Sequence, residues 1–185
     1  AVHVPLLVGG QSTLSQALPA LALRGDGQAI AAAIHAGRPT VLSLVPQVLG
    51  AWAAALGRRG ERAPDCLRVV AVGGAPLAAG LARAAEGLGI PVYEGYGLTE
   101  CGSVVALNRA GANRPGTVGK PLDGVTVEIE DDEIVVKGET VMEGYLHGPR
   151  ANGVWRTGDI GAIDATGHLV VRGRKDAMLV TSLGR

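Results

Sequence analysis

The sequence has no excess of either charge and few cysteines. Lys and Arg number 17, as do Asp and Glu, and no basic stripe is present, so we do not expect a nucleic-acid partner. Cys66 and Cys101 lack the spacing of metal ligands, which favours a reduced, cytoplasmic protein. No apolar run is long enough for a transmembrane helix, and no signal peptide opens the chain, so we expect no membrane span.

What is present is the composition of a globular protein. The 185 residues are 47% hydrophobic and 18% charged, which suits one large domain or two small ones with a real core. Both ends interrupt apolar patterns: the chain lacks an initiator Met, and residues 178–183 resemble a final strand with nothing after it. We therefore expect a fragment of a longer protein.

Residues 1–112 alternate between strand and helix signals. Apolar, strand-like runs occupy 40–45, 67–72 and 92–93, and the second would be buried on both faces of a parallel sheet. Between the runs, apolar residues recur at helical spacing, as in Val48, Leu49, Trp52 and Leu56. Strand–helix–strand order predicts a parallel α/β subdomain.

From residue 116 onward the period of apolar residues changes to two. Short strands are predicted at 125–129, 133–137 and 168–172, separated by Asp- and Gly-containing turns. The segment 108–115 is rich in Gly, Asn, Arg and Pro, and we place the boundary after residue 112. The predicted fold class is α/β, with part of a parallel-sheet subdomain (1–112) followed by a small antiparallel β-barrel-like subdomain (113–185).

Two predicted strands end in glycine-rich turns, Gly73-Gly74-Ala75-Pro76 and Gly95-Tyr96-Gly97. Ligands of parallel α/β sheets bind beyond the carboxyl ends of the strands, so these turns could form a slot for a purine, with Tyr96 as one wall. Thr99 offers a hydroxyl to a phosphate oxygen, and Glu100 a carboxylate that suits Mg²⁺. Taken singly, each feature has a simpler reading as turn punctuation or as a helix cap.

Further segments extend this pattern, and with them the chain resembles the adenylate-forming superfamily, which includes acyl-CoA synthetases, luciferase-like enzymes and nonribosomal adenylation domains. The likeness covers roughly residues 65–185. The matching segments are Gly73-Gly74-Ala75-Pro76-Leu77, residues 93–100, Gly116-Thr117-Val118-Gly119-Lys120-Pro121, residues 135–138, Met142-Glu143-Gly144-Tyr145, Trp155-Arg156-Thr157-Gly158-Asp159 and Gly173-Arg174-Lys175-Asp176.

The resemblance implies a role for each matched position. Thr99 would hold the α-phosphate of ATP, and Glu100 would coordinate Mg²⁺, so these two are the predicted catalytic residues. Asp159 would accept hydrogen bonds from both ribose hydroxyls, and Arg174 would reach ribose or phosphate. In isolation, Asp159 could instead be a turn aspartate and Arg174 a solvated charge at a strand end. Gly73, Gly74 and Ala75 would line the adenine, and Tyr96 would stack on it. The remaining predicted nucleotide-binding positions are Pro76, Glu94, Gly95 and Gly97.

The implied reaction joins a carboxylic acid to ATP, releases pyrophosphate, and passes the acyl group to a thiol of coenzyme A or of a carrier's phosphopantetheine. Two family parts are absent from the sequence: the phosphate loop with its lysine, and the small C-terminal domain with a second lysine. The residue at Asp176 is the hinge before that domain in the family. We therefore expect the piece alone to be inactive.

The acid is less clearly indicated. Glu94 and the closing segment 181–185 are similar to fatty acyl-CoA synthetases, which favours a fatty or other lipophilic acid. Two alternatives stay open: an amino- or aryl-acid adenylation domain that loads a carrier protein, and a non-catalytic nucleotide-binding module.

Overall fold

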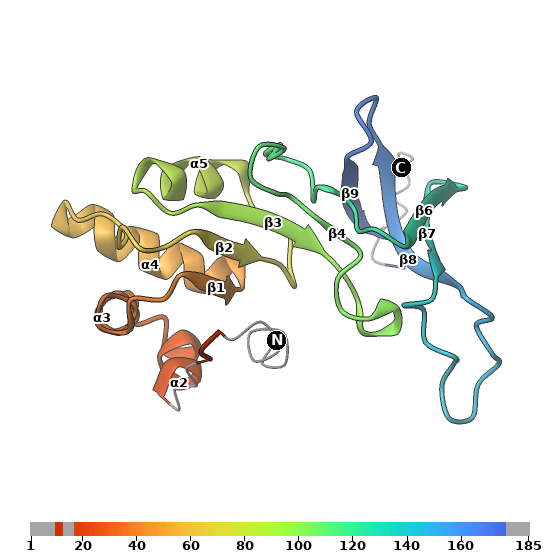
Figure 1. The fold of residues 1–185 in the computed structure, drawn as a ribbon, viewed down its shortest axis with the longest axis horizontal. Coiled ribbons are helices and arrows are strands. Elements are labelled where there is room, and N and C mark those ends of the chain that lie inside the picture. The colour runs from red at the N-terminus through yellow and green to blue at the C-terminus, as the bar shows by residue number, and fades with distance from the viewer. Residues whose placement is uncertain (1–9, 13–16, 177–185) are drawn as a thin grey trace, which may run out of the picture.

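The protein contains two β-sheets that follow one another along the chain (Figure 1). The computed structural model describes residues 10–12 and 17–176, so the predicted terminal strand at 178–183 and the segment 181–185 lie outside the described residues. The first sheet has the strand order β1-β2-β3-β4-β5, and the second has the order β6-β7-β8-β9. The predicted fold class, a parallel α/β part followed by an antiparallel β part, is confirmed.

In the described residues the helices all precede the second sheet. They are α2 (Ala17–Arg24), α3 (Gly27–Gly37), α4 (Pro46–Arg59), α5 (Ala79–Gly87) and the 3₁₀ turn η1 (Thr99–Cys101). The strands of the first sheet are β1 (Val41–Leu44), β2 (Val69–Val72), β3 (Val92–Tyr96), β4 (Ala106–Leu107) and β5 (Lys120–Pro121). Those of the second are β6 (Val125–Glu130), β7 (Glu133–Gly138), β8 (Val154–Ile163) and β9 (Leu169–Arg174). None of the helices among these described residues is long and apolar enough to cross a membrane.

Strands β1, β2 and β3 pair in parallel, with α4 and α5 as the connections between them. Along β2, Val70 and Val72 are fully buried, whereas Val69 and Ala71 are only half-buried. Residues alternate between the two faces of a strand, so the described residues cover one face of the sheet well and the other only in part. The expectation that this strand is buried on both faces is therefore not met within the described residues.

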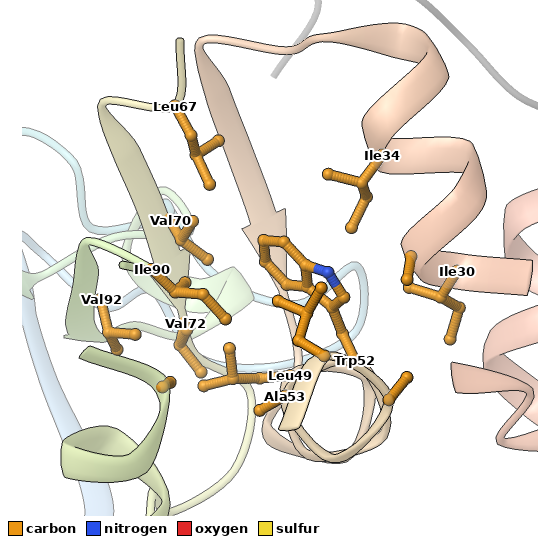
Figure 2. Close-up of a cluster of buried hydrophobic side chains, with 14 residues drawn as sticks. Ile30, Ile34, Leu49, Trp52, Ala53, Leu67, Val70, Val72, Ile90 and Val92 are labelled. Carbon is orange, nitrogen blue, oxygen red and sulfur yellow. The ribbon is translucent and has the colours of Figure 1, made fainter. Parts of the chain in front are cut away.

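The covered face of the first sheet carries a hydrophobic core (Figure 2). Trp52 of α4 is completely buried and stands between Ile30 and Ile34 of α3 on one side and the valines of the strands on the other. The two helices approach closely because α3 begins with a glycine: a Cβ at Gly27 would lie 2.1 Å from the carbonyl oxygen of Ala51. This core fixes the strands whose ends form the site described below.

A second core joins the end of the first sheet to the antiparallel sheet. Val105 and Ala106 at β4 pack in one buried cluster with Ile134 and Val136 of β7 and with Leu169 of β9. Backbone bonds reinforce the junction, since Val118 donates to the Leu169 carbonyl at 2.9 Å and Leu169 to the Gly119 carbonyl at 2.8 Å. The antiparallel sheet is thereby held beside the end of β3.

The end of β3 differs from the sequence prediction. We expected a short strand at 92–93 and a turn at Gly95-Tyr96-Gly97, but β3 continues to Tyr96, and its last residues pair antiparallel with β4. A Cβ at Gly95 would lie 2.9 Å from Cδ1 of Leu107, so this glycine permits close strand pairing and does not form a turn. The turn begins only at Gly97, where a Cβ would lie 1.8 Å from the Ser103 carbonyl oxygen.

Strand β8 was not predicted, although it is the longest strand in the described part of the chain, with 10 residues. It contains Gly158 and Gly161 and no clean alternation of apolar residues, and irregularities interrupt its pairing with both β7 and β9. Its pairing partners, not its own pattern, make it a strand. Strands β4 and β5 and helix α2 were also missed, and β5 joins the first sheet although it follows the expected boundary at residue 112.

Candidate functional site

A pocket of about 450 Å³ lies at the carboxyl ends of β1, β2 and β3. Parallel α/β sheets bind ligands at this edge. The pocket walls are residues 43–45, 71–74 and 95–99 together with Ser103, Val104 and Leu107. Of the predicted site residues, the walls include Gly73, Gly74, Gly95, Tyr96, Gly97 and Thr99.

The two glycine-rich segments lie side by side because β2 and β3 are paired, with Val72 opposite Glu94. A Cβ at Gly73 would lie 3.2 Å from the Gly95 carbonyl oxygen, so a side chain there would press on the neighbouring backbone. Gly74 has φ +80°, a conformation that favours glycine. The absence of side chains at these two glycines leaves backbone atoms as the wall of the pocket here.

Glu94 ties the first of these segments to β3. Its Oε1 atom accepts a hydrogen bond of 3.2 Å from the backbone N–H of Leu77, directly after Pro76. Burial raises the pKa of the Glu94 carboxyl, and the bond from Leu77 partly opposes that effect. Ala75 and Pro76 are not among the wall residues, but this bond holds the turn that contains them against β3.

Tyr96 and Asp159 meet although they come from different sheets. The Tyr96 hydroxyl donates a hydrogen bond of 2.5 Å to Oδ2 of Asp159, and the Asp159 side chain is only 15% exposed. Burial raises the pKa of the Tyr96 hydroxyl strongly, and the bond to Asp159 adds to the increase. The Tyr96 hydroxyl therefore stays protonated and donates its hydrogen bond to Asp159 on β8.

Arg174 occupies the position on β9 directly opposite Asp159. Its Nη1 donates to the Thr157 carbonyl at 2.9 Å and to Oδ1 of Asp159 at 3.4 Å. Its Nε and Nη2 donate to the two carboxylate oxygens of Asp176 at 3.1 and 3.2 Å. The structure thus brings Tyr96, Asp159 and Arg174 together, as the sequence prediction requires.

Thr99 and Glu100 lie in η1, where Thr99 belongs to the pocket wall and Glu100 directly follows it. Oε1 of Glu100 accepts a hydrogen bond of 2.5 Å from the Tyr145 hydroxyl. That bond is the main cause that lowers the pKa of Glu100, and the charge of Arg174 contributes a smaller decrease. Sequence reasoning assigned no role to Tyr145, although the residue stands in one of the motifs on which the resemblance rests.

The donor set fits Mg²⁺ bound together with a phosphate-bearing ligand. Among the described residues, no group of three or more His, Cys, Asp or Glu side chains could enclose a metal. Mg²⁺ usually keeps several waters and binds through one or two carboxylates plus substrate phosphates. The ionised carboxylate of Glu100 at the edge of the pocket meets that requirement.

Comparison with known proteins agrees with this geometry. The family model described as AMP-binding enzyme matches residues 1–146. The long-chain-fatty-acid–CoA ligase FadD15 of Mycobacterium bovis is 31% identical over all of this chain and 38% of its own length. The 2-succinylbenzoate–CoA ligase of a Geobacillus species is 37% identical over 80% of this chain and 33% of its own length. The chain thus spans about a third of the length of these relatives.

Solved structures give the same result. The anthranilate CoA ligase AuaEII in complex with anthranoyl-AMP superposes with a TM-score of 0.75 and 27% identity, over 85% of this chain and 34% of that one. The O-succinylbenzoate coenzyme A synthetase of Bacillus subtilis, in complex with ATP and magnesium, gives a TM-score of 0.72 and 29% identity over 84% and 36%. The chain belongs to the family of AMP-binding enzymes.

Proposed function

We propose that the full-length protein activates a carboxylic acid with ATP to an acyl-adenylate and then transfers the acyl group to a thiol, such as that of coenzyme A. The observation that carries the proposal is the contact between Tyr96 and Asp159 beside the pocket, because it joins an aromatic wall and a carboxylate around a space for one nucleoside. A cytoplasmic location is part of the proposal, since ATP and coenzyme A are available there.

In this proposal the adenine lies between the backbone wall at Gly73, Gly74 and Ala75 and the ring of Tyr96. The hydrogen bond to Asp159 holds the hydroxyl end of that ring in place. A carboxylate offers about four lone-pair directions, and Tyr96 and Arg174 each use one on Asp159, so two ribose hydroxyls can still donate to it. Arg174 supplies a permanent positive charge next to the same carboxylate.

The phosphates lie toward η1. Thr99 donates its hydroxyl to an oxygen of the α-phosphate, and Glu100 holds a divalent cation through its ionised carboxylate. Bound Mg²⁺ would neutralise part of the negative charge of the phosphates. The contribution of these side chains is to orient ATP so that an acid carboxylate faces the α-phosphorus in line with the departing pyrophosphate. An acyl–phosphate bond forms while the bond to pyrophosphate breaks.

The walls of the pocket favour a lipophilic acid. None of the residues that line it in the described part of the chain is charged, and Val45, Ala71 and Val104 make much of the surface apolar. A fatty acid is the narrower proposal, in line with FadD15. An aryl acid is the second candidate, because the succinylbenzoate and anthranilate ligases to which the chain is similar act on aryl acids.

The test is pyrophosphate exchange into ATP by the purified full-length protein, with fatty acids of increasing length, benzoates and amino acids in parallel. We expect exchange with a lipophilic acid and a loss of at least tenfold in Asp159→Asn, which keeps the shape but removes the charge. Mass spectrometry of the product with coenzyme A or a carrier identifies the thiol. Tight AMP binding without exchange for any acid would favour a non-catalytic nucleotide-binding module and contradict the proposal.

A further inference from the structure

Glu100 is held by a residue to which the proposed function gives no role. The Tyr145 hydroxyl donates to Oε1 of Glu100 at 2.5 Å, across 45 positions of the chain. The Tyr145 side chain otherwise lies largely in solvent, with the residue 60% exposed. A tyrosine this exposed contributes little to the hydrophobic core. Its main polar contact is the bond to the Glu100 carboxylate.

The loop that carries Tyr145 is also attached to the same turn through its backbone. Residues 139–153 connect β7 to β8, and within them the N–H of Met142 donates to the Glu100 carbonyl at 2.8 Å. A Cβ at Gly102 would lie 3.3 Å from Cβ of Thr140, so the turn and the loop are in close contact. These backbone contacts therefore hold the loop beside the turn independently of the hydrogen bond between the side chains of Tyr145 and Glu100.

The ring of Tyr145 is oriented from the other side by Trp155 of β8. The two rings meet edge to face, with centroids 6.0 Å apart and planes inclined by 65°. Trp155 packs against the second core, and its strand also carries Asp159. The position of the Tyr145 hydroxyl is thus set by the same strand that presents the proposed ribose-binding carboxylate.

A glutamate near the surface loses rotamer freedom when it binds a cation, and a partner that fixes it beforehand reduces that cost. Carboxylates that bind metals are commonly oriented by such hydrogen bonds. We infer that Tyr145 is a positioning residue, which holds Glu100 in the orientation that binds a divalent cation carried by the phosphates of ATP. The inference rests on the proposed function, which identifies ATP as the ligand that carries this cation.

The opposite role, in which Tyr145 blocks Glu100, makes a different prediction. A carboxylate has two oxygens, and Tyr145 takes one lone pair of Oε1, so the second oxygen retains its directions for a cation. If Tyr145 orients the carboxylate, removal of its hydroxyl weakens cation binding. If Tyr145 competes with the cation, the same removal strengthens cation binding.

The test uses Mn²⁺ as a spectroscopic probe with the full-length protein and α,β-methylene-ATP, which is not cleaved at the α-phosphorus. Free Mn²⁺ is measured by electron paramagnetic resonance for the wild type, Tyr145→Phe and Tyr93→Phe. Tyr93 is the matched control, because it loses the same atom and its hydroxyl makes no hydrogen bond to another described residue. We expect the apparent Kd for Mn²⁺ to rise about tenfold in Tyr145→Phe and to stay at the wild-type value in Tyr93→Phe.

An equal or smaller Kd in Tyr145→Phe overturns the inference, as does a wild type that binds no Mn²⁺ with the analogue. A second measurement separates positioning from general damage: in pyrophosphate exchange, the half-saturating Mg²⁺ concentration should rise while the KM for the acid stays constant. A parallel rise in both would indicate a merely structural role and contradict the inference. A wild type without exchange overturns the proposed function, whereas the Mn²⁺ titration still decides the role of Tyr145.

Discussion

The hydroxyl of Tyr96 and the carboxylate of Asp159 lie 2.5 Å apart, although 63 positions separate them in the chain and each belongs to a different sheet. Tyr96 ends β3 of the first sheet, and Asp159 lies within β8 of the second. The shared second core brings these strands together. One hydrogen bond therefore connects the wall of the pocket to the antiparallel sheet.

Removal of that hydrogen bond should weaken nucleotide binding. In Tyr96→Phe the ring stays but Asp159 loses one of its two side-chain donors, and a hydrogen bond to a charged group contributes about 1.5–3 kcal/mol. We expect the Kd for AMP, measured by calorimetry on the full-length protein, to rise about tenfold. Tyr93→Phe serves as the control. An unchanged Kd in Tyr96→Phe would show that the orientation of the ring does not depend on Asp159.

The turn after β3 should tolerate no side chain at Gly97. A Cβ there would lie 1.8 Å from the Ser103 carbonyl oxygen, so Gly97→Ala must displace the backbone, at a cost of about 1–3 kcal/mol in the free energy of unfolding. Gly57→Ala is the matched control, because that exposed position in α4 has nothing within 4 Å and should gain about 0.5–1 kcal/mol from helix propensity. Urea denaturation compares them, and equal effects would contradict the close approach seen at Gly97.

Asp164 should stabilise the β8–β9 hairpin in a pH-dependent way. Its carboxylate accepts bonds from Thr166 and from the His168 N–H, which with the charge of Arg114 lower its pKa from 3.8 to about 2. A depressed pKa means that the stabilisation is complete above pH 4 and is lost as the pH falls toward 2.

Asp164→Asn should therefore lower the Tm relative to wild type at pH 7, and the difference should shrink between pH 4 and pH 2. Thermal unfolding over this range measures it, with the exposed Asp123→Asn as the control. A difference that stays constant with pH would mean that the charge of Asp164 has no part in the effect.

Substitutions of Trp52 compare two effects on the stability of the first core: the volume of the side chain and the polarity of its buried N–H group. Its Nε1 is buried without a hydrogen-bond partner among the described residues, which is unfavourable by about 1–3 kcal/mol. Trp52→Phe removes this donor together with part of the ring, so we expect a net loss below about 2 kcal/mol. Trp52→Ala should cost about 3–5 kcal/mol. Chemical denaturation measures both, and similar losses would show that the N–H group carries no penalty.

Residues 1–185 alone should release little pyrophosphate from ATP, Mg²⁺ and a panel of acids. The family's phosphate-loop lysine and C-terminal lysine, which the resemblance implies, are not part of this sequence, and the chain spans 38% of FadD15. A colorimetric pyrophosphate assay of this piece beside the full-length protein tests the expectation. Robust release by the piece would mean that these residues suffice for the reaction.

Local patterns predicted much of the first sheet and its helices. The apolar spacing from Val48 to Leu56 and the glycine after two arginines identify α4, which indeed ends at Arg59 with Gly60 at φ +64°. Strands β1 and β2 likewise follow from apolar runs bounded by Pro46 and Gly73. In α4 the backbone bonds and the buried stripe depend on nearby residues, and β1 and β2 are marked by continuous apolar runs, so the sequence carries the signal.

The sequence indicated which residues belong to the candidate site, but not every contact between them. The motifs identified Tyr96, Glu100 and Asp159. The structure places Tyr96 in the pocket wall and bonds it to Asp159, while the roles of all three residues stay predictions. The sequence could not indicate that Tyr145 bonds to Glu100, because the contact crosses 45 positions and depends on the path of a long loop.

Local sequence patterns identified the class of the fold and the helices α3, α4 and α5, and they predict a set of residues that bind a nucleotide. The tertiary structure alone decided that β3 continues through Gly95, that β8 is a strand, and which carboxylate receives which hydroxyl. The physical reason is the origin of the hydrogen bonds: a helix satisfies its backbone within a few residues, whereas β8 depends on partners from β7 and β9. Such long-range pairing leaves little trace in a local pattern.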